Sequence, residues 1–179
     1  MTPITLESPL ATDIKSHFQD KILKMNDHRG DLTLLIDRAD IQSVCTDVKN
    51  VDKFQFNQMI DLTAVDYLYH NRDVRFQMVY HLFSLSLLHR IRIKCDVPVD
   101  DATIDSIHDI WDAANWYERE CYDMYGINFK NHPDQRRIIM YDEFEGHPLR
   151  KDYPITMEQP RVELRDIPER YNYMDKHLQ

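Results

Sequence analysis

The residues best suited to chemistry or recognition gather between positions 116 and 154 of the 179-residue chain. Glu118 and Glu120 could act as a general acid/base pair only if both side chains reached one substrate. Residues two apart on a helix point to different sides, so this spacing argues against a shared site. Arg119 and Asp123 are four apart and share one side of the same predicted helix. That charged side fits either a solvated surface or an edge that contacts a partner.

Few residues have the spacing that redox cofactors or metal ions require. Cys45, Cys95 and Cys121 form no Cys-x-x-Cys pair, so they predict neither an iron–sulfur cluster nor a disulfide framework. The Glu120 carboxylate beside Cys121 would raise the pKa of that thiol, which favours a core cysteine over a nucleophile. The nine histidines include no His-Glu-x-x-His pair, and three glycines leave no room for a glycine-rich phosphate loop. We therefore expect no cofactor, no metal and no catalytic residue in this chain.

A short helix is predicted to position the charged residues. Asn115 would cap its first turn, with Glu118 reaching back in a variant of the capping box. Gly126 stands where a left-handed residue would end the helix. The side facing the core would be formed by Ala114, Tyr117, Cys121 and Met124. Beyond Gly126 the chain has turns but no long element, so other parts of the protein must satisfy its backbone groups.

The rest of the chain alternates between helical and strand patterns. Ser8 and Pro9 start a helix whose apolar residues recur at helical spacing through Met25. Alternating apolar residues over 74–82 and 87–95 predict two neighbouring strands. The other predicted elements are strands at 32–36, 59–65 and 137–141, and helices at 41–48 and 104–111. Together they predict an α+β fold: a small, mostly antiparallel sheet with helices packed on it, followed by an extended irregular C-terminal tail.

We divide the chain into a body, residues 1–135, and a C-terminal segment, residues 136–179. The body includes the charged helix, and the C-terminal segment is expected to dock on a neighbouring protein. From Tyr153 onward the segment is charged, aromatic and dotted with prolines, and long unperiodic segments are usually functional or disordered. Leu164, Tyr171 and Tyr173 favour docking over free solvation.

Charge and hydropathy exclude several classes of partner. A net charge of −9 disfavours binding to nucleic acid or to an anionic lipid surface. The longest apolar stretch, around 82–88, is too short to span a bilayer, and no secretory signal is expected at the N-terminus. Membrane association is therefore expected only through partner proteins.

One specific sequence pattern remains once cofactor, metal and membrane-spanning motifs are excluded. It comprises Glu118, Arg119, Glu120, Asp123, Gly126, Phe129, His132, Pro133, Arg137, Gly146, His147, Pro148, Leu149, Arg150, Lys151, Asp152, Tyr153 and Pro154. These signature residues resemble the signature of the C subunit of NADH–quinone oxidoreductase, the family of the 30 kDa subunit of respiratory complex I. The segment 61–67 is similar to a second, weaker family segment, whereas the first sixty residues carry no motif that we match.

The resemblance implies a cofactor-free structural subunit in the peripheral arm of a proton-pumping complex. It implies that FMN and iron–sulfur clusters belong to other subunits. It also implies that the signature residues contact partners, chiefly the D subunit of the complex and also its B and I subunits. The expected location is peripheral, on the cytoplasmic face of the bacterial inner membrane. Two alternatives stay open: a related membrane-bound hydrogenase or ferredoxin-linked complex, and a free-standing acid/base enzyme using Glu120, Asp123 and His132.

Overall fold

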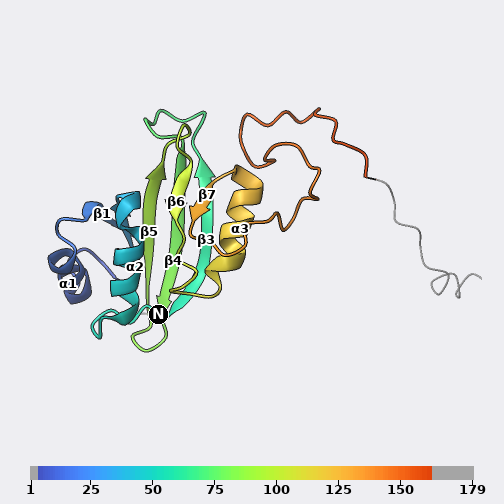
Figure 1. Cartoon of the computed structure of the whole chain (residues 1–179). Coiled ribbons are helices and arrows are strands. Elements are labelled where there is room, and N and C mark those ends of the chain that lie inside the picture. The colour runs from blue at the N-terminus through green and yellow to red at the C-terminus, as the bar shows by residue number, and fades with distance from the viewer. Residues whose placement is uncertain (1–3, 163–179) are drawn as a thin grey trace, which may run out of the picture.

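A computed structural model describes residues 4–162 of the chain. The predicted contacts of Leu164, Tyr171 and Tyr173 lie outside the described residues. A five-stranded sheet has the strand order β1-β2-β5-β4-β3, and a smaller sheet pairs β6 with β7. In chain order the elements are α1 (Pro9–His17), β1 (Ile22–His28), β2 (Asp31–Ile36), the short 3-10 helix η1 (Arg38–Asp40), α2 (Ile41–Asn50), β3 (Gln58–Asp66), β4 (Phe76–Ser84), β5 (His89–Val97), β6 (Thr103–Asp105), α3 (Ala114–Tyr125) and β7 (Asn128–Lys130). Only β2 and β5 pair in parallel within the large sheet, so the predicted α+β class with a mostly antiparallel sheet is confirmed (Figure 1).

One face of the large sheet forms the core. Leu34, Ile93, Tyr80 and Leu62 are partners in successive strands, so they make one apolar row across four strands. All four are buried in the core cluster, together with the predicted apolar face of α2, which consists of Ile41, Val44, Cys45 and Val48. The alternation in the sequence therefore predicted correctly which face of these strands would be covered.

The predicted first helix is too long. Ser8 caps α1 as expected, with its hydroxyl accepting the N–H of Ala11 at 3.3 Å. The helix ends at His17, and Ile22 and Met25, which continue its spacing, instead belong to β1. Pairing of β1 with β2 in a hairpin gives these residues antiparallel partners. That strand pairing outweighs the local helical pattern.

Two further predicted elements are wrong. The predicted helix at 104–111 does not form. Residues 103–105 form β6, because they pair in parallel with β7, a three-residue strand that the sequence pattern did not reveal, and residues 106–111 form turns and irregular backbone. Residues 137–141 form no strand. The backbone N–H groups of residues 138–140 are satisfied by one side chain of α3 instead of by a neighbouring strand.

Helix α3 covers the outer edge of β3. The Tyr117 hydroxyl donates to the backbone oxygen of Ile60 at 3.2 Å, and the Cys121 thiol donates to that of Leu62 at 3.8 Å. An uncovered strand edge invites pairing with another chain, and a helix laid along it prevents this. In Figure 1, β3 lies next to α3, and the orange C-terminal segment lies on the side of α3 away from α1 and α2.

Candidate functional site

Helix α3 ends as predicted but begins differently. Gly126 ends it with φ +76°, a left-handed conformation that glycine adopts without penalty. A Cβ added at Gly126 would lie 2.6 Å from the His147 ring, so the available space also requires glycine. The predicted Asn115 cap is wrong. Ala113 holds the N-cap position without a side-chain bond, because the helix begins two residues too early for Asn115 to cap it.

Glu118 is buried rather than turned back to the start of the helix. Its Oε1 accepts the backbone N–H of Ile107 at 2.8 Å, and its Oε2 accepts the Ser106 hydroxyl. Burial raises the pKa of Glu118 to about 7, although both hydrogen bonds favour the charged form. Glu118 therefore ties α3 to the loop after β6, and the predicted capping box is wrong.

Asp123 is the residue around which the C-terminal segment folds back onto α3. Its side chain is fully buried. Oδ2 accepts the backbone N–H groups of residues 138, 139 and 140 at 3.1, 2.8 and 2.9 Å, and Oδ1 accepts Arg137 Nη1 at 2.7 Å. Burial disfavours the carboxylate, but these hydrogen bonds outweigh burial and lower the pKa of Asp123. A charged carboxylate of α3 thus fixes a turn that itself contains no helix or strand.

Two arginines hold the same turn. Arg119 donates from Nε to the backbone oxygen of Arg136 at 3.1 Å and from Nη2 to that of Arg137 at 3.2 Å. Its guanidinium also lies 5.3 Å from the centre of the exposed Trp116 ring. Arg137, in turn, donates from Nη2 to the backbone oxygen of Gly146 at 3.0 Å. Both arginines therefore bind backbone carbonyls of the C-terminal segment and crosslink it to α3.

The stretch from Gly146 to Leu149 caps the C-terminal end of α3. His147 donates from Nδ1 to the backbone oxygen of Asp123 at 2.9 Å, and the N–H of Leu149 donates to that of Met124 at 3.1 Å. The last carbonyls of a helix have no partner within the helix, so these two bonds satisfy groups that would otherwise be orphaned.

A second cluster attaches residues 150–152 to the end of β3. Asp66 is buried, and its Oδ2 accepts Arg75 Nη2 and the N–H of Lys151, both at 2.8 Å. Arg75 also binds Asp152 at 2.7 and 2.9 Å. Burial opposes ionisation of Asp66, but the bonds from Arg75 and the backbone lower its pKa. Arg75 lowers the pKa of Asp152 to about 2. Arg150 lies over the ring of Phe76, 5.3 Å from its centre.

His132 is held at both ring nitrogens. Nε2 donates to the backbone oxygen of Asn115 at 3.2 Å, and Nδ1 accepts the N–H of Asp134 at 3.1 Å. Burial lowers the pKa of His132. Because both nitrogens of His132 and both oxygens of Asp123 are occupied, the acid/base alternative lacks the open groups that it requires. Its third member, Glu120, is solvent-exposed.

The remaining signature residues divide between the interior and the surface. Phe129 is buried, and the Tyr153 ring stacks on that of Phe144 with 6.0 Å between centres. Pro148 is half-buried. The exposed members are Glu120, Pro133, Gly146, Leu149, Lys151, Asp152 and Pro154. The structure therefore brings most of the signature into one network inside the chain, and contact with a partner stays a prediction.

Sequence reasoning missed two members of this network. Arg75, which joins Asp66 to Asp152, lies in the predicted strand at 74–82, where its position in the alternation predicts only an outward-facing polar residue. Ser106, the partner of Glu118, lies in the region predicted to be helical. Asp66 itself had a signal, because it belongs to the 61–67 segment of the weaker resemblance.

The described residues, 4–162, hold neither a metal-binding cluster nor a membrane span. Within this range no group of three His, Cys, Asp or Glu side chains is placed to hold a metal ion. No helix of the described part is long and apolar enough to cross a bilayer. The three cysteines are free and buried.

The fold and the site define a small α+β protein in which a charged helix organises a long irregular segment. A family profile described as "Respiratory-chain NADH dehydrogenase, 30 Kd subunit" matches residues 34–159. The C subunit of the NADH-quinone oxidoreductase of Geotalea uraniireducens is 44% identical over 142 residues, which cover 79% of this chain and 84% of the relative. The chain therefore belongs to the family of the 30 kDa subunit of respiratory-chain NADH dehydrogenase, and the resemblance seen in the sequence is confirmed.

Solved structures show the same fold. The chain resembles "Nqo5 of the trypsin-resistant fragment (1-134)" with a TM-score of 0.60 and 28% identity, over 70% of this chain and 96% of the fragment. It also resembles a chain in the structure of the membrane-bound sulfane sulfur reductase, an archaeal respiratory membrane complex. That likeness has a TM-score of 0.71, covers 95% of this chain and 91% of the other, and at 22% identity shows the fold alone.

Proposed function

We propose that the chain is a cofactor-free structural subunit in the peripheral arm of a proton-pumping NADH–quinone oxidoreductase. Membership of the 30 kDa family supports its place in that complex. The observation that carries the structural role is the use of the signature side chains. Asp123, Arg119 and His147 all bind backbone groups at the contact between α3 and the C-terminal segment. They build a rigid surface, and in this arrangement they do not form an open reaction site.

The C-terminal segment has the two-sided character of a docking element. Its polar backbone groups face α3, while several apolar side chains face outward. The exposed ones are Ile139 (54% exposed), Leu149 (46%), Ile155 (100%) and Val162 (53%). Exposed apolar side chains along one ordered segment are typical of a surface that a partner covers. We infer that the D subunit of the complex covers it, with the B and I subunits adjoining.

In this proposal the electrons travel through other subunits. The three cysteines offer poor cluster ligands, because burial raises the pKa of each thiol and keeps it protonated. FMN and the iron–sulfur clusters would therefore belong to neighbouring subunits. The chain would support transfer from NADH to quinone by holding the subunits beside the quinone site in place.

The proposed location is the cytoplasmic face of the bacterial inner membrane. The described part contains no membrane-spanning helix, so attachment would come through the partner subunits. The same fold in the archaeal sulfane sulfur reductase complex keeps a related hydrogenase-type or ferredoxin-linked assembly as the second candidate.

Affinity isolation tests both candidates. A tagged chain expressed in its own host would be recovered from detergent-solubilised membranes, and the accompanying proteins would be identified and quantified by mass spectrometry. We expect the D, B and I subunits in amounts equal to the tagged chain, together with the NADH-oxidising subunits. Hydrogenase-type input subunits in their place would favour the second candidate. Recovery of the chain alone would refute both.

A further inference from the structure

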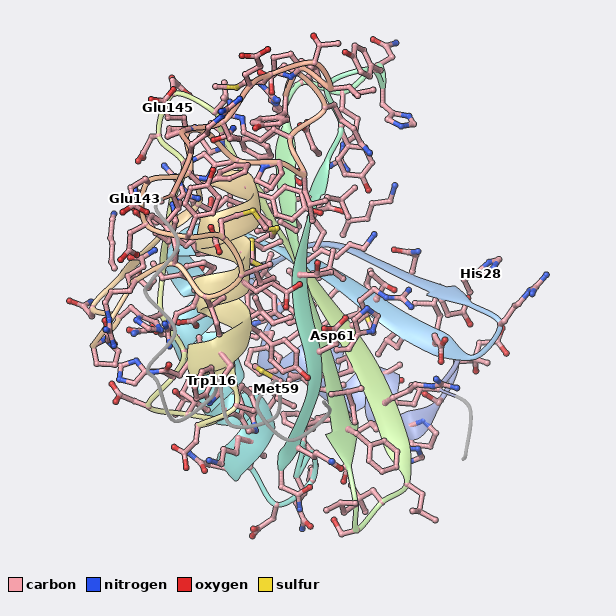
Figure 2. The ribbon with its side chains drawn as sticks, turned by 90° about the vertical axis from the view of Figure 1, so that its right-hand side faces the viewer. His28, Met59, Asp61, Trp116, Glu143 and Glu145 are labelled. Atoms are coloured by element: carbon pink, nitrogen blue, oxygen red, sulfur yellow. The ribbon has the colours of Figure 1, made fainter. Side chains whose placement is uncertain are left out.

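The face of the large sheet opposite α2 and α3 carries a groove lined by cations. Figure 2 shows α2 and α3 on one side of the sheet, with His28 at the tip of the β1–β2 hairpin, away from both helices. The groove has a volume of about 470 Å³. Its charged lining consists of Lys24, His28, Arg72, Arg92 and Lys94, and we call it the basic groove. Among residues 4–162 no carboxylate lines it, although the chain as a whole carries a net charge of −9.

Strand pairing fixes this gathering of positive charge. Arg92 and Lys94 are two apart on β5, so their side chains point to the same face. Their partners on β2 are Thr33 and Leu35, and Leu35 in turn pairs with Lys24 on β1. Three cations from two strands thus lie on one face, separated only by the short or uncharged side chains of β2.

Within the described part of the chain, an ion pair balances the positive charge of the basic groove only at Arg72, whose partner is Asp96. There, no ion pair joins Lys24, Arg92 or Lys94 to a carboxylate, and Arg92 donates to the Thr33 hydroxyl at 3.3 Å. Nearby Asp96 is already engaged, because it accepts Arg72 at 2.9 Å and Gln77 at 2.7 Å. Burial, Arg92 and Arg72 together lower the pKa of Lys94. The groove therefore holds like charges that an added anion would stabilise.

The layout of the cations indicates the kind of anion. A lone phosphate is bound best by donors that converge on one point, such as paired arginine forks or backbone N–H groups. Here the cations are spread over two strands and a loop, and the forks of Arg72 and Arg92 are partly occupied by Asp96 and Thr33. Spaced carboxylates on a polypeptide fit this spread better. The uncharged lining residue Leu35 offers that polypeptide an apolar contact between the charges.

We propose that the basic groove binds an acidic segment of a partner polypeptide, whose aspartate or glutamate carboxylates pair with Lys24, Arg92 and Lys94. This surface lies on the sheet, away from the contact between α3 and the C-terminal segment. The chain would therefore hold two neighbours, one at each surface. The inference rests on the chain being part of an assembly, as proposed above.

Lysine footprinting on the assembled complex provides the test. The isolated chain and the affinity-purified complex would each be acetylated under identical conditions, and the modification rate of each lysine would be read by mass spectrometry. We expect Lys24 and Lys94 to react at least about tenfold more slowly in the complex. A zero-length carbodiimide would then join one of them to an aspartate or glutamate of another polypeptide.

Charge reversal gives the matched comparison. Lys24→Glu with Lys94→Glu should lower recovery of the cross-linked partner at physiological salt by about tenfold, while Lys15→Glu with Lys130→Glu, the same change in net charge elsewhere, should not. If the Lys24/Lys94 variant does not fold, lysine footprinting of the wild-type protein still tests whether a partner covers the basic groove. Unchanged labelling of both lysines in an intact complex overturns this inference alone. Recovery of the chain without partners overturns it together with the proposed function. If inorganic phosphate protected Lys24 and Lys94 of the isolated chain as strongly as the complex does, the groove would be a small-anion site, and the inference would also be overturned.

Discussion

Replacing Asp123 with asparagine removes the charge around which the C-terminal segment folds. If the asparagine oxygen takes the place of Oδ2, the N–H groups of residues 138–140 keep an acceptor, but a neutral one. Each such bond weakens by about 1 kcal/mol when the acceptor loses its charge. The asparagine nitrogen then faces Arg137, which loses its carboxylate. That loss costs about another 1–2 kcal/mol, because the Arg137 side chain is 16% exposed and gains only partial hydration.

The sum, about 4 kcal/mol, should appear as local opening rather than as global unfolding. The core row of the sheet does not touch these bonds, whereas the turn at 138–140 has no other anchor of comparable strength. A loss of that size corresponds to an opening equilibrium about a thousandfold more favourable.

Amide hydrogen exchange at constant pH measures this directly. In Asp123→Asn the amides of residues 138–140 should exchange faster by up to that factor, while amides of β4 and β5 keep their rates. Glu120→Gln, which neutralises an exposed carboxylate on the same helix, is the control and should change neither set. If residues 138–140 exchanged at wild-type rates in a folded Asp123→Asn protein, the anchoring role of Asp123 would be wrong.

Glu118, Gly126 and the C-terminal segment each give a further prediction. The raised pKa of Glu118 means that the folded state binds more protons than the unfolded state between the ordinary value, 4.5, and about 7. Stability should therefore fall by about 3 kcal/mol as pH rises through this window, and Glu118→Gln should remove the slope in urea titrations at pH 5 and pH 8. The same pH dependence in the wild type and in Glu118→Gln would contradict it. The comparison is needed because the lowered pKa values of His81 and His132 make stability rise with pH in both proteins. Gly126→Ala should lower the free energy of unfolding by about 2–4 kcal/mol, because both the φ of +76° and the contact with His147 penalise a Cβ. Gly30→Ala, at φ +82°, should lower it only by the cost of the left-handed backbone conformation. Equal costs would exclude the His147 contact. A chain ending at Asp152 should keep the circular dichroism and urea midpoint of the body but lose co-purification with the D subunit, and normal recovery of that partner would contradict docking through the segment.

Strong local patterns were sufficient to predict part of the fold. Strand β5 alternates between polar and apolar residues, β4 does so except at Val79 and Phe83, and α2 places Ile41, Val44 and Val48 on one side. For β5 and α2, burial follows directly from the pattern. In β4 the predicted apolar set is buried, but Gln77 and Val79 on the other face are buried as well. These elements form the centre of the sheet and the helix in its core cluster, so their patterns and the final structure agree.

Errors arose where pairing with another strand decided the local structure. Ile22 and Met25 continue the helical spacing of α1, yet pairing with β2 makes them strand residues. Residues 103–105 resemble a helix start, but β7 supplies a strand partner more than twenty residues later. The strand at 32–36 was predicted, but the local sequence did not reveal that Ile22 and Met25 pair with it, and β7 was not predicted at all. In both cases strand pairing outweighs weak propensity.

The signature located the site but not the role of each residue. Charges such as Asp123 and Arg119 suit an exposed edge as well as an internal anchor. The choice depends on whether residues 136–140 fold back onto α3. No helix or strand pattern in the sequence marks this reversal, because the side chain of Asp123, rather than a neighbouring strand, accepts the backbone N–H groups. The role of Arg75 was not predicted for a similar reason, because one of its two carboxylate partners, Asp152, comes from the distant C-terminal segment.

Cross-linking in the purified complex tests most directly the claim that the C-terminal segment docks on a neighbouring redox protein. Lys151 is exposed at the point where the segment leaves the Asp66 cluster, so an amine-reactive cross-linker can reach from it to an adjacent protein. We predict that Lys151 is joined to the D subunit. Lys151 joined only to residues of its own chain, in a complex whose other lysines do cross-link to the D subunit, would contradict docking through this segment.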